Sequence, residues 1–302
     1  MENLVNDLYS WNSSNKFLQK IKLFSVWRNL IRIIFNIIMP IWYKLRAGRT
    51  LSGLTTQASP KVIVSLTTFP KRINRIWLVI ESILNQTIGP DKIILWLSEE
   101  QFKDINDLPS NLLKLTGRGL DIRFVKEDLK SYKKYYYSFK EYPNDIIITV
   151  DDDIIYPNNM IANLLLYHQK YPNAVICRYC YEMKREGGVL LSYNNWDLQT
   201  TKEEIRDKEL FFGSGGGVLF PPLSCYKDVT NKNLFMNLCK SADDVWLNAM
   251  VQLNHTRIVK CGGKCVIFPV LNKDDIKLFS ENICQNDIYI SNVRDYYNKA
   301  VF

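Results

Sequence analysis

The chain has 302 residues, of which 47% are hydrophobic and 23% charged, as in an ordinary soluble globular protein with one large domain. Its formal net charge of +8 is unevenly spread, because twelve Lys and Arg precede Glu81 while 27 basic and 29 acidic residues follow from there. This near-neutral main region disfavours a nuclease, a polymerase or any nucleic-acid partner, since such proteins place positive charge around their groove. Seven cysteines without framework spacing predict reduced, structural thiols.

Residues 1–58 are predicted to form a basic amphipathic helical segment with a polar linker, and residues 59–302 the main domain. Between Lys16 and Arg49, basic residues alternate with large apolar ones. The densest apolar run has about half of the roughly 20 residues that cross a bilayer, and Arg32 and Pro40 interrupt it. We expect a helix lying on the anionic inner face of the cytoplasmic membrane, with packing against the main domain as the alternative.

From Lys61 onward, apolar β-branched runs alternate with stretches of helical periodicity. The predicted strands are residues 61–67, 93–97, 121–125 and 146–150, and the predicted helices between them are residues 73–84, 112–115 and 133–142. This alternation predicts an open, mainly parallel α/β sheet with flanking helices, in which ligands bind beyond the carboxyl ends of the strands. The second half is less regular, with a helix at 158–169, a strand at 174–178, a Gly-rich strand start at 213–220 and a helix beginning near Ser241.

Three consecutive aspartates, Asp151 to Asp153, end the fourth predicted strand. Carboxylates at positions i and i+2 after a strand can project to the same side and hold a hard divalent cation such as Mn²⁺ or Mg²⁺. Such an ion would act as Lewis acid on the diphosphate of a nucleotide-sugar donor. A solvated turn is the alternative, but the buried strand before the triplet and the Ile154-Ile155-Tyr156-Pro157 segment after it favour a ligand role.

The segment Ile148 to Pro157 resembles the DxD segment of bacterial capsule and lipopolysaccharide glycosyltransferases of the GT-A (Rossmann-like) fold. It is especially similar to that of the heparosan capsule α-N-acetylglucosaminyltransferase. Val64 to Arg72 resembles the first-strand nucleotide site of that group, and Ala242 to Trp246 its C-terminal acidic motif. The resemblance covers roughly Lys61 to His255.

This resemblance implies roles at the donor site. Asp151 and Asp153 would correspond to the metal ligands, and Asp152 would lie nearer the ribose or the donor sugar. The other implied nucleotide-sugar contacts are Thr67, Thr68 and Arg72, with Lys133 or Lys134 near the donor diphosphate. For Arg72 and the two lysines, a plain surface charge is the alternative.

The second half supplies the remaining candidates. Gly215 and Gly216 would let the backbone approach the donor sugar or the acceptor, because no Cβ intervenes, or would form a strand-leading bulge. The resemblance makes Asp244, before Asp243, the catalytic carboxylate, although acids behind a Ser241 N-cap would stabilise the helix in any case. His255 is a candidate third metal ligand, as in some GT-A enzymes.

The sequence therefore predicts a metal-dependent hexosyl- or N-acetylhexosaminyltransferase. It would move a sugar from a nucleotide-sugar donor, a UDP-sugar by preference, to a surface glycan or lipid-linked acceptor in capsule or lipopolysaccharide biosynthesis. A sugar nucleotidyltransferase is one alternative, although no glycine-rich phosphate loop follows the first strand. A catalytically inactive membrane-bound scaffold is the other.

Overall fold

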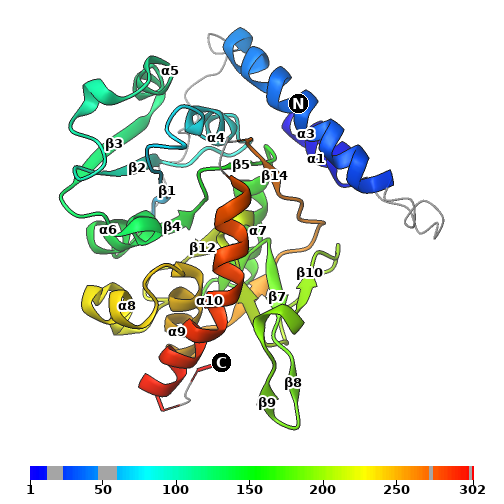
Figure 1. Cartoon of the computed structure of the whole chain (residues 1–302), viewed down its shortest axis with the longest axis vertical. Helices are drawn as coiled ribbons and strands as arrows, with labels where there is room; N and C mark the ends of the chain where they lie inside the picture. Colours follow the sequence, from blue (N-terminus) through cyan, green and yellow to red (C-terminus); the bar gives the residue numbers. More distant parts are fainter. Residues whose placement is uncertain (12–22, 47–59, 272–274, 299–300) are drawn as a thin grey trace.

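The computed structural model describes residues 1–11, 23–46, 60–271, 275–298 and 301–302, and within residues 275–284 only the course of the backbone. Lys16 to Lys22 of the predicted N-terminal segment, and most of the linker before Pro60, lie outside the described residues. Figure 1 shows the central sheet with helices around it and the N-terminal helices at one side.

The centre of the molecule is a seven-stranded, mainly parallel sheet. In spatial order its strands are β13 (Ile258–Lys260), β6 (Val175–Cys177), β12 (Val218–Phe220), β4 (Ile146–Thr149), β1 (Val62–Thr67), β2 (Lys92–Ser98) and β3 (Leu120–Val125). Only β12 runs antiparallel to its neighbours, β4 and β6. β1 and β4 are almost wholly buried, which explains their continuous apolar sequence. The expected α/β fold class, a mainly parallel sheet with flanking helices and an N-terminal helical segment, is confirmed.

Helices flank the sheet, and most of them lie where the sequence predicts one, the exceptions being Lys232–Leu238 and Asp275–Tyr296, which it does not predict. The helices are α4 (Ile76–Leu84), α5 (Ser110–Leu113), α6 (Lys133–Glu141), α7 (Met160–Lys170), α8 (Lys232–Leu238), α9 (Asp243–Leu253) and α10 (Asp275–Tyr296). All nine residues of α4 are buried, consistent with its strongly apolar sequence. Ala242 and not Ser241 is the N-cap of α9, and the Ser241 hydroxyl instead lies 2.9 Å from that of Tyr289 on α10.

Short strands that the periodicity does not reveal make up the rest of the second half. A three-stranded antiparallel sheet has the order β10 (Asp197–Gln199), β7 (Cys180–Glu182) and β11 (Leu210–Phe212). The two-stranded pairs are β8 (Arg185–Glu186) with β9 (Val189–Leu190), and β5 (Ile154–Ile155) with β14 (Phe268–Pro269). β5 directly follows the three aspartates, so pairing with β14 holds the chain beyond them.

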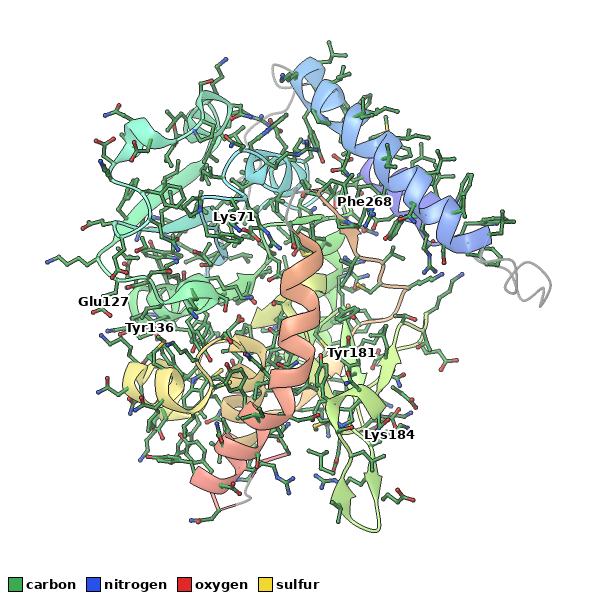
Figure 2. All side chains as sticks on the ribbon, viewed as in Figure 1. Lys71, Glu127, Tyr136, Tyr181, Lys184 and Phe268 are labelled. Carbon is green, nitrogen blue, oxygen red and sulfur yellow. The ribbon has the colours of Figure 1, made fainter. Side chains whose placement is uncertain are left out.

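Two N-terminal helices, α1 (Glu2–Tyr9) and α3 (Leu23–Arg46), pack on the main domain. One face of α3 is buried, and its Phe35 and Tyr43 join the same hydrophobic core as residues of the central sheet. The Phe268 ring of β14 lies 5.2 Å from that of Tyr9 and 6.5 Å from that of Phe35, beside the N-terminal helices (Figure 2). One face of α3 therefore packs on the domain, as the alternative expectation has it, while the other face remains exposed and the membrane expectation stays a prediction.

Pro40 interrupts the apolar run but not the helix, since α3 continues unbroken through it. A proline has no N–H for the carbonyl four residues earlier. That carbonyl belongs to Asn36, and it accepts a hydrogen bond from Arg75 Nη2 at 3.1 Å instead. With 24 residues, α3 is long and apolar enough to cross a membrane by length and composition, a criterion that core helices and signal sequences also meet. The length of α3 therefore does not by itself exclude a span.

Asn36 is predicted to be the main polar anchor of α3. Its amide donates to Pro269 O at 3.1 Å and accepts from Leu271 N at 2.8 Å. We expect Asn36→Ala to lower the free energy of unfolding by about 2 kcal/mol, because it leaves two partly buried backbone groups without their partner. Urea unfolding measures the change. Asn237→Ala, at an exposed position of α8, is the matched control and should change stability by less than about 0.5 kcal/mol. Equal stability of the two variants would contradict the anchor role.

Candidate active site

A cleft of about 560 Å³ opens at the carboxyl ends of β1 and β4. This is where ligands bind in sheets of this kind. The end of β1, the end of β4, the start of α6 and the start of α9 all contribute to it. Its lining residues are Thr67, Thr68, Phe69, Arg72, Gln101, Asp128, Lys130, Ser131, Lys133, Lys134, Val150, Asp151, Asp152, Asp153, Ser214, Ser241, Asp243 and Asp244. Most residues predicted from the sequence are therefore brought together.

The three aspartates have different environments. Asp152 is buried and accepts hydrogen bonds from Thr68 Oγ1 at 2.5 Å and Arg72 Nη1 at 2.6 Å. Burial raises its pKa, although Arg72 and Thr68 act in the opposite direction. The side chains of Asp151 and Asp153 are 29% and 26% exposed, so they face the cleft. Arg72 Nη1 also lies 2.9 Å from Asp153 Oδ2. Asp152 thus fixes the turn through protein contacts, while Asp151 and Asp153 are accessible to a ligand.

Lys134, on the first turn of α6, is a buried cation between two acidic segments. Its Nζ lies 3.0 Å from Asp151 Oδ1 and 2.7 Å from Asp243 Oδ2, and it donates to Ser214 Oγ at 2.8 Å. The contact with Asp243 is a close ion pair whose geometry is not that of an aligned hydrogen bond. Burial alone would lower the pKa of Lys134, but Asp151, Asp243 and Asp244 together raise it well above its usual value. Lys134 is therefore charged and links the two acidic motifs.

Asp244 is a carboxylate in the cleft whose pKa is raised into the neutral range. Burial and the charge of Asp243 raise this pKa to about 7, against the opposing effects of Lys134 and Ser214. Ser214 donates to Asp244 Oδ1 from its hydroxyl at 3.0 Å and from its N–H at 3.3 Å. A carboxylate that titrates near neutrality in a cleft is suited to acid–base chemistry.

Two other predicted residues line the cleft but use their polar groups within the protein. Thr67 Oγ1 donates to Trp96 O at 2.8 Å. Lys133 is 1% exposed and forms an ion pair with Asp128, so of the two adjacent lysines only Lys134 reaches the acidic motifs. Both residues shape the wall of the cleft.

Gly215 and Gly216 are required by packing within the protein. A Cβ on Gly216 would lie 2.7 Å from Tyr179 Cβ and 2.8 Å from Tyr179 N. A Cβ on Gly215 would lie 2.9 Å from Ile267 Cδ1. The space beside each glycine is therefore filled by the chain itself, which accounts for both without a close approach to a donor or an acceptor.

His255 does not reach the cleft, which corrects its place among the expected metal ligands. It follows the far end of α9, a helix of 11 residues whose first residues are Asp243 and Asp244. At about 1.5 Å per residue, the length of α9 places it about 16 Å from them. It lines a different hollow with Lys170 and Arg257.

The residues present fit a divalent cation held jointly with a ligand. Within the described ranges, no group of three or more His, Cys, Asp and Glu side chains is arranged to hold a metal ion by itself. Asp151 and Asp153 nevertheless offer hard carboxylate oxygens on the cleft wall, and Mg²⁺ is commonly held by one or two carboxylates together with substrate phosphates. Asp151 and Asp153 would hold the ion.

Sequence reasoning missed several residues. Ser214 connects Lys134 with Asp244, and the Tyr156 hydroxyl accepts from Asp151 N at 2.9 Å. The short Gly-Ser-Gly run and the Tyr-Pro that follows the aspartates were the available signals. Outside the cleft, the sequence also contains a C-x-x-C pair, Cys177 and Cys180, and both thiols are free and buried.

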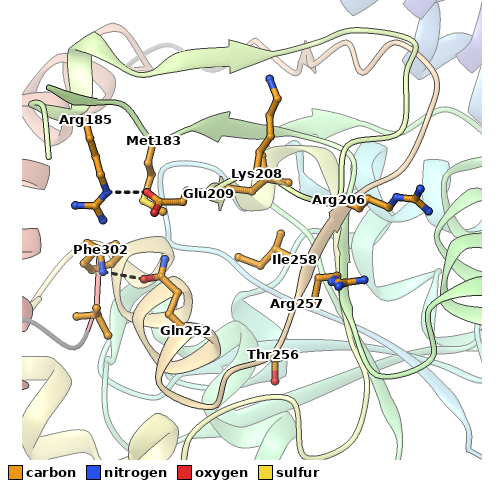
Figure 3. A pocket seen from close by; sticks show the side chains of 12 residues that line it. Met183, Arg185, Arg206, Lys208, Glu209, Gln252, Thr256, Arg257, Ile258 and Phe302 are labelled. Carbon is orange, nitrogen blue, oxygen red and sulfur yellow. Dashed lines mark hydrogen bonds and ion pairs between the residues drawn. The ribbon is translucent and has the colours of Figure 1, made fainter. Parts of the chain in front are cut away.

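A second hollow of about 410 Å³ lies near the end of the chain, between β11 and the end of α9 (Figure 3). Arg185, Arg206, Lys208 and Arg257 make it basic. Arg185 Nε already lies 2.9 Å from Glu209 Oε2, and Lys208 lies 2.8 Å from Glu182. None of the predicted site residues lines it.

No family model and no curated protein matches the sequence. Solved structures resemble the fold. The mannosyltransferase PcManGT from Pyrobaculum calidifontis, in complex with GDP-Man and Mn²⁺, is 13% identical with a TM-score of 0.49, and the match covers 88% of this chain and 75% of that one. S. aureus TarS (residues 1–349) with UDP-GlcNAc is 13% identical with a TM-score of 0.46, over 68% of this chain and 57% of that one. S. aureus TarS (residues 1–349) with UDP is 12% identical with a TM-score of 0.48, over 78% of this chain and 66% of that one. Both matches therefore span less than two thirds of the TarS chain. At TM-scores below 0.5, none of these likenesses says what this protein binds.

The raised pKa of Asp244 predicts that removing its charge stabilises the protein. The carboxyl titrates near 3.8 ordinarily and at about 7 in the fold, so its ionisation makes stability fall as the pH rises between these values. Asp244→Asn cannot ionise and keeps an acceptor for Ser214. We expect it to exceed the wild type by roughly 1 to 4 kcal/mol at pH 8, with the difference vanishing towards pH 4. Thermal unfolding across this pH range checks the expectation.

The adjacent substitution Asp243→Asn is the matched control, and it is expected to change the stability in the opposite direction. It weakens the ion pair with Lys134 and should be less stable than the wild type at pH 8. If Asp244→Asn is no more stable than the wild type at pH 8, the ionised Asp244 is not unfavourable in the fold.

Proposed function

We propose that this protein is a metal-dependent glycosyltransferase. It transfers a hexosyl or N-acetylhexosaminyl group from a nucleotide-sugar donor, a UDP-sugar by preference, to a surface glycan or lipid-linked acceptor. The observation that carries the proposal is the cleft in which two accessible carboxylates, Asp151 and Asp153, lie across Lys134 from the titratable Asp244. A group transfer from a diphosphate needs these two functions next to each other.

The donor half of the cleft is formed by the ends of β1 and β4. Asp151 and Asp153 would hold Mn²⁺ or Mg²⁺, which supplies Lewis-acid stabilisation to the departing diphosphate when bound. Arg72 adds a guanidinium 2.9 Å from Asp153, suited to a phosphate oxygen. Thr67 and Thr68 hold the turn that forms the nucleotide wall, through Trp96 O and Asp152 respectively.

Asp244 acts on the acceptor in this proposal. Its pKa of about 7 leaves it ionised at mildly alkaline pH, and Ser214 fixes its direction. For a transfer with inversion, Asp244 takes the proton of the acceptor hydroxyl as general base. For a transfer with retention, its negative charge stabilises the oxocarbenium-like sugar. Asp243 keeps Lys134 in place beside it.

Loss of a metal ligand tests the enzymatic proposal. We expect Asp153→Ala, and likewise Asp151→Ala, to abolish Mn²⁺-stimulated transfer and hydrolysis across a panel of UDP- and GDP-sugars. Titration calorimetry with Mn²⁺ and UDP or GDP should show weaker metal binding, while circular dichroism remains unchanged because both side chains face the cleft. Asp207→Ala, at an exposed aspartate paired with Arg206, is the control and should behave as the wild type. Full metal-dependent transfer by both variants would refute the metal assignment.

We also propose that α3 attaches the protein to the inner face of the cytoplasmic membrane. An apolar stripe at helical spacing remains exposed on α3, formed by Val26, Leu30, Ile33, Ile37, Ile41 and Leu45. The helix has no acidic residue, and Arg28, Lys44 and Arg46 are exposed near its ends. Basic residues beside an apolar stripe complement an anionic lipid surface, each contributing on the order of 1 kcal/mol.

An orientation in the plane of the membrane is favoured over a span. The opposite face of α3 is buried from Phe24 to Tyr43, along nearly the whole helix. To cross a bilayer, α3 would have to leave the domain and expose those contacts. We therefore place the outer stripe in the headgroup layer, where a lipid-linked acceptor would be presented.

Substitution on the stripe tests this attachment without removing the helix. We expect the triple variant Ile33→Ser, Ile37→Ser, Ile41→Ser to remain folded and to lose sedimentation with phosphatidylglycerol-containing vesicles at low salt. The control replaces exposed apolar residues elsewhere, Leu166→Ser, Val189→Ser and Leu198→Ser, and should sediment as the wild type does. Equal sedimentation of both triple variants would refute the membrane proposal. It would also be refuted if the stripe variant differed from the wild type only in its oligomeric state, as measured by gel filtration.

A further inference from the structure

Three half-buried tyrosines lie outside the donor cleft but close to Asp244. Tyr179 directly precedes β7, Tyr181 is the middle residue of that strand, and Tyr193 belongs to the 3₁₀ turn Tyr193–Asn195. Gly213 joins them to the site. A Cβ on Gly213 would lie 3.0 Å from the Tyr179 ring and 3.8 Å from Asp244 Oδ2. The Tyr179 ring and the Asp244 carboxylate are thus neighbours across a glycine.

The tyrosines form one continuous aromatic surface. The Tyr179 and Tyr181 rings lie 5.6 Å apart at 87°, and their hydroxyls are 2.9 Å apart. The Tyr181 and Tyr193 rings lie 5.2 Å apart, and Tyr193 packs at 5.0 Å on the buried Trp196. The surface therefore begins beside the carboxylate and leads away from it, with a spacing between rings close to the length of one hexose residue.

The elements around this surface hold it in place. β7 is the central strand of its sheet, with Tyr181 paired to Leu198 on one side and Phe211 on the other. Tyr193 N donates to Asp287 Oδ1 of α10 at 2.7 Å. Figure 2 labels Tyr181, whose ring packs at 5.2 Å on that of Tyr193. A rigid aromatic surface at the edge of a cleft is a binding surface in form, because it loses little side-chain entropy on binding.

Taken with Asp244, the geometry points to an acceptor subsite in which a neutral sugar ring of the acceptor glycan lies against Tyr179, Tyr181 and Tyr193. This inference rests on the proposed function, since it supplies the second substrate of the same reaction. A pyranose ring has an apolar C–H face that packs on an aromatic ring, and hydroxyls that bond with phenol O–H groups. Asp244 lines the donor cleft while the tyrosines do not, so it stands where donor and acceptor meet.

The chemistry distinguishes this subsite from the donor side. Asp151, Asp153 and Arg72 present charges suited to a cation and a diphosphate, whereas the tyrosines present neutral rings and hydroxyls. Burial raises the pKa of both Tyr179 and Tyr193, so their hydroxyls remain protonated donors at physiological pH. An acceptor hydroxyl at the end of the ring nearest Tyr179 would lie next to Asp244.

Binding of simple glycosides to the full-length protein tests the subsite. The probes are the methyl glycopyranosides of glucose, galactose, mannose and N-acetylglucosamine. Their binding is measured by saturation-transfer NMR in the presence of UDP or GDP and Mn²⁺. We expect at least one to bind the wild type through its ring C–H protons, with Tyr181→Ala weakening it about tenfold or more. Tyr181→Phe, which keeps the ring, should retain most of the binding. Tyr296→Ala, at a tyrosine 51% exposed on α10, is the matched control and should bind as the wild type does.

Nucleotide binding, measured by calorimetry on the same samples, separates this inference from the proposed function. Unchanged nucleotide affinity with glycoside binding lost in Tyr181→Ala supports the subsite. Glycoside binding that is equal in Tyr181→Ala and the wild type overturns it, as does a wild type that binds the nucleotide and none of the glycosides. A wild type that binds neither UDP nor GDP contradicts the proposed function itself, and the subsite with it.

Discussion

The ammonium group of Lys134 is the interaction on which the candidate site depends. It is buried between Asp151 at the end of β4 and Asp243 at the start of α9, segments almost a hundred residues apart. Without a cation between them, several carboxylates in one cleft would repel each other and stay apart. Burial, together with the negative charge of Asp243, nevertheless raises the pKa of Asp244 to about 7, against the opposing effect of Lys134. The arrangement that raises this pKa is therefore the one that lets Asp244 titrate near neutral pH.

The first half of the fold could be predicted from the sequence because its elements are long and buried. Residues such as those of β1 and α4 form uninterrupted apolar or helical patterns, and their boundaries were found within a few residues. The second half could not, since β7, β10 and β11 have three residues each, too few to show a periodicity. The continuity of α3 through Pro40 also depends on a partner distant in sequence, because Arg75 donates to the Asn36 carbonyl that Pro40 leaves without a helical hydrogen bond.

Most residues that line the cleft could also be predicted from the sequence, although the contacts of each residue could not. Their position at the end of a strand was enough to predict that Asp151 and Asp153 line the cleft. Only the structure shows that Asp152, between them, accepts hydrogen bonds from Thr68 and Arg72. Likewise Lys133 and Lys134 are equivalent in the sequence, and the direction of each side chain on α6 decides which meets the acidic motifs. The prediction of His255 as a metal ligand was wrong because α9 separates this residue from Asp243 and Asp244 at the start of the helix.

A single turn between β1 and α4 connects the candidate site with the N-terminal helix. Arg72 N bonds to Phe69 O and Arg75 N bonds to Arg72 O, so the turn is fixed by its own backbone. Arg72 contacts Asp152 and Asp153 in the cleft, and Arg75, three residues later, contacts Asn36 on α3. If the outer face of α3 lies in a membrane, the position of the cleft relative to that membrane is set by this turn. Attachment and catalysis would then share one rigid support, because neither arginine can shift far without moving the other.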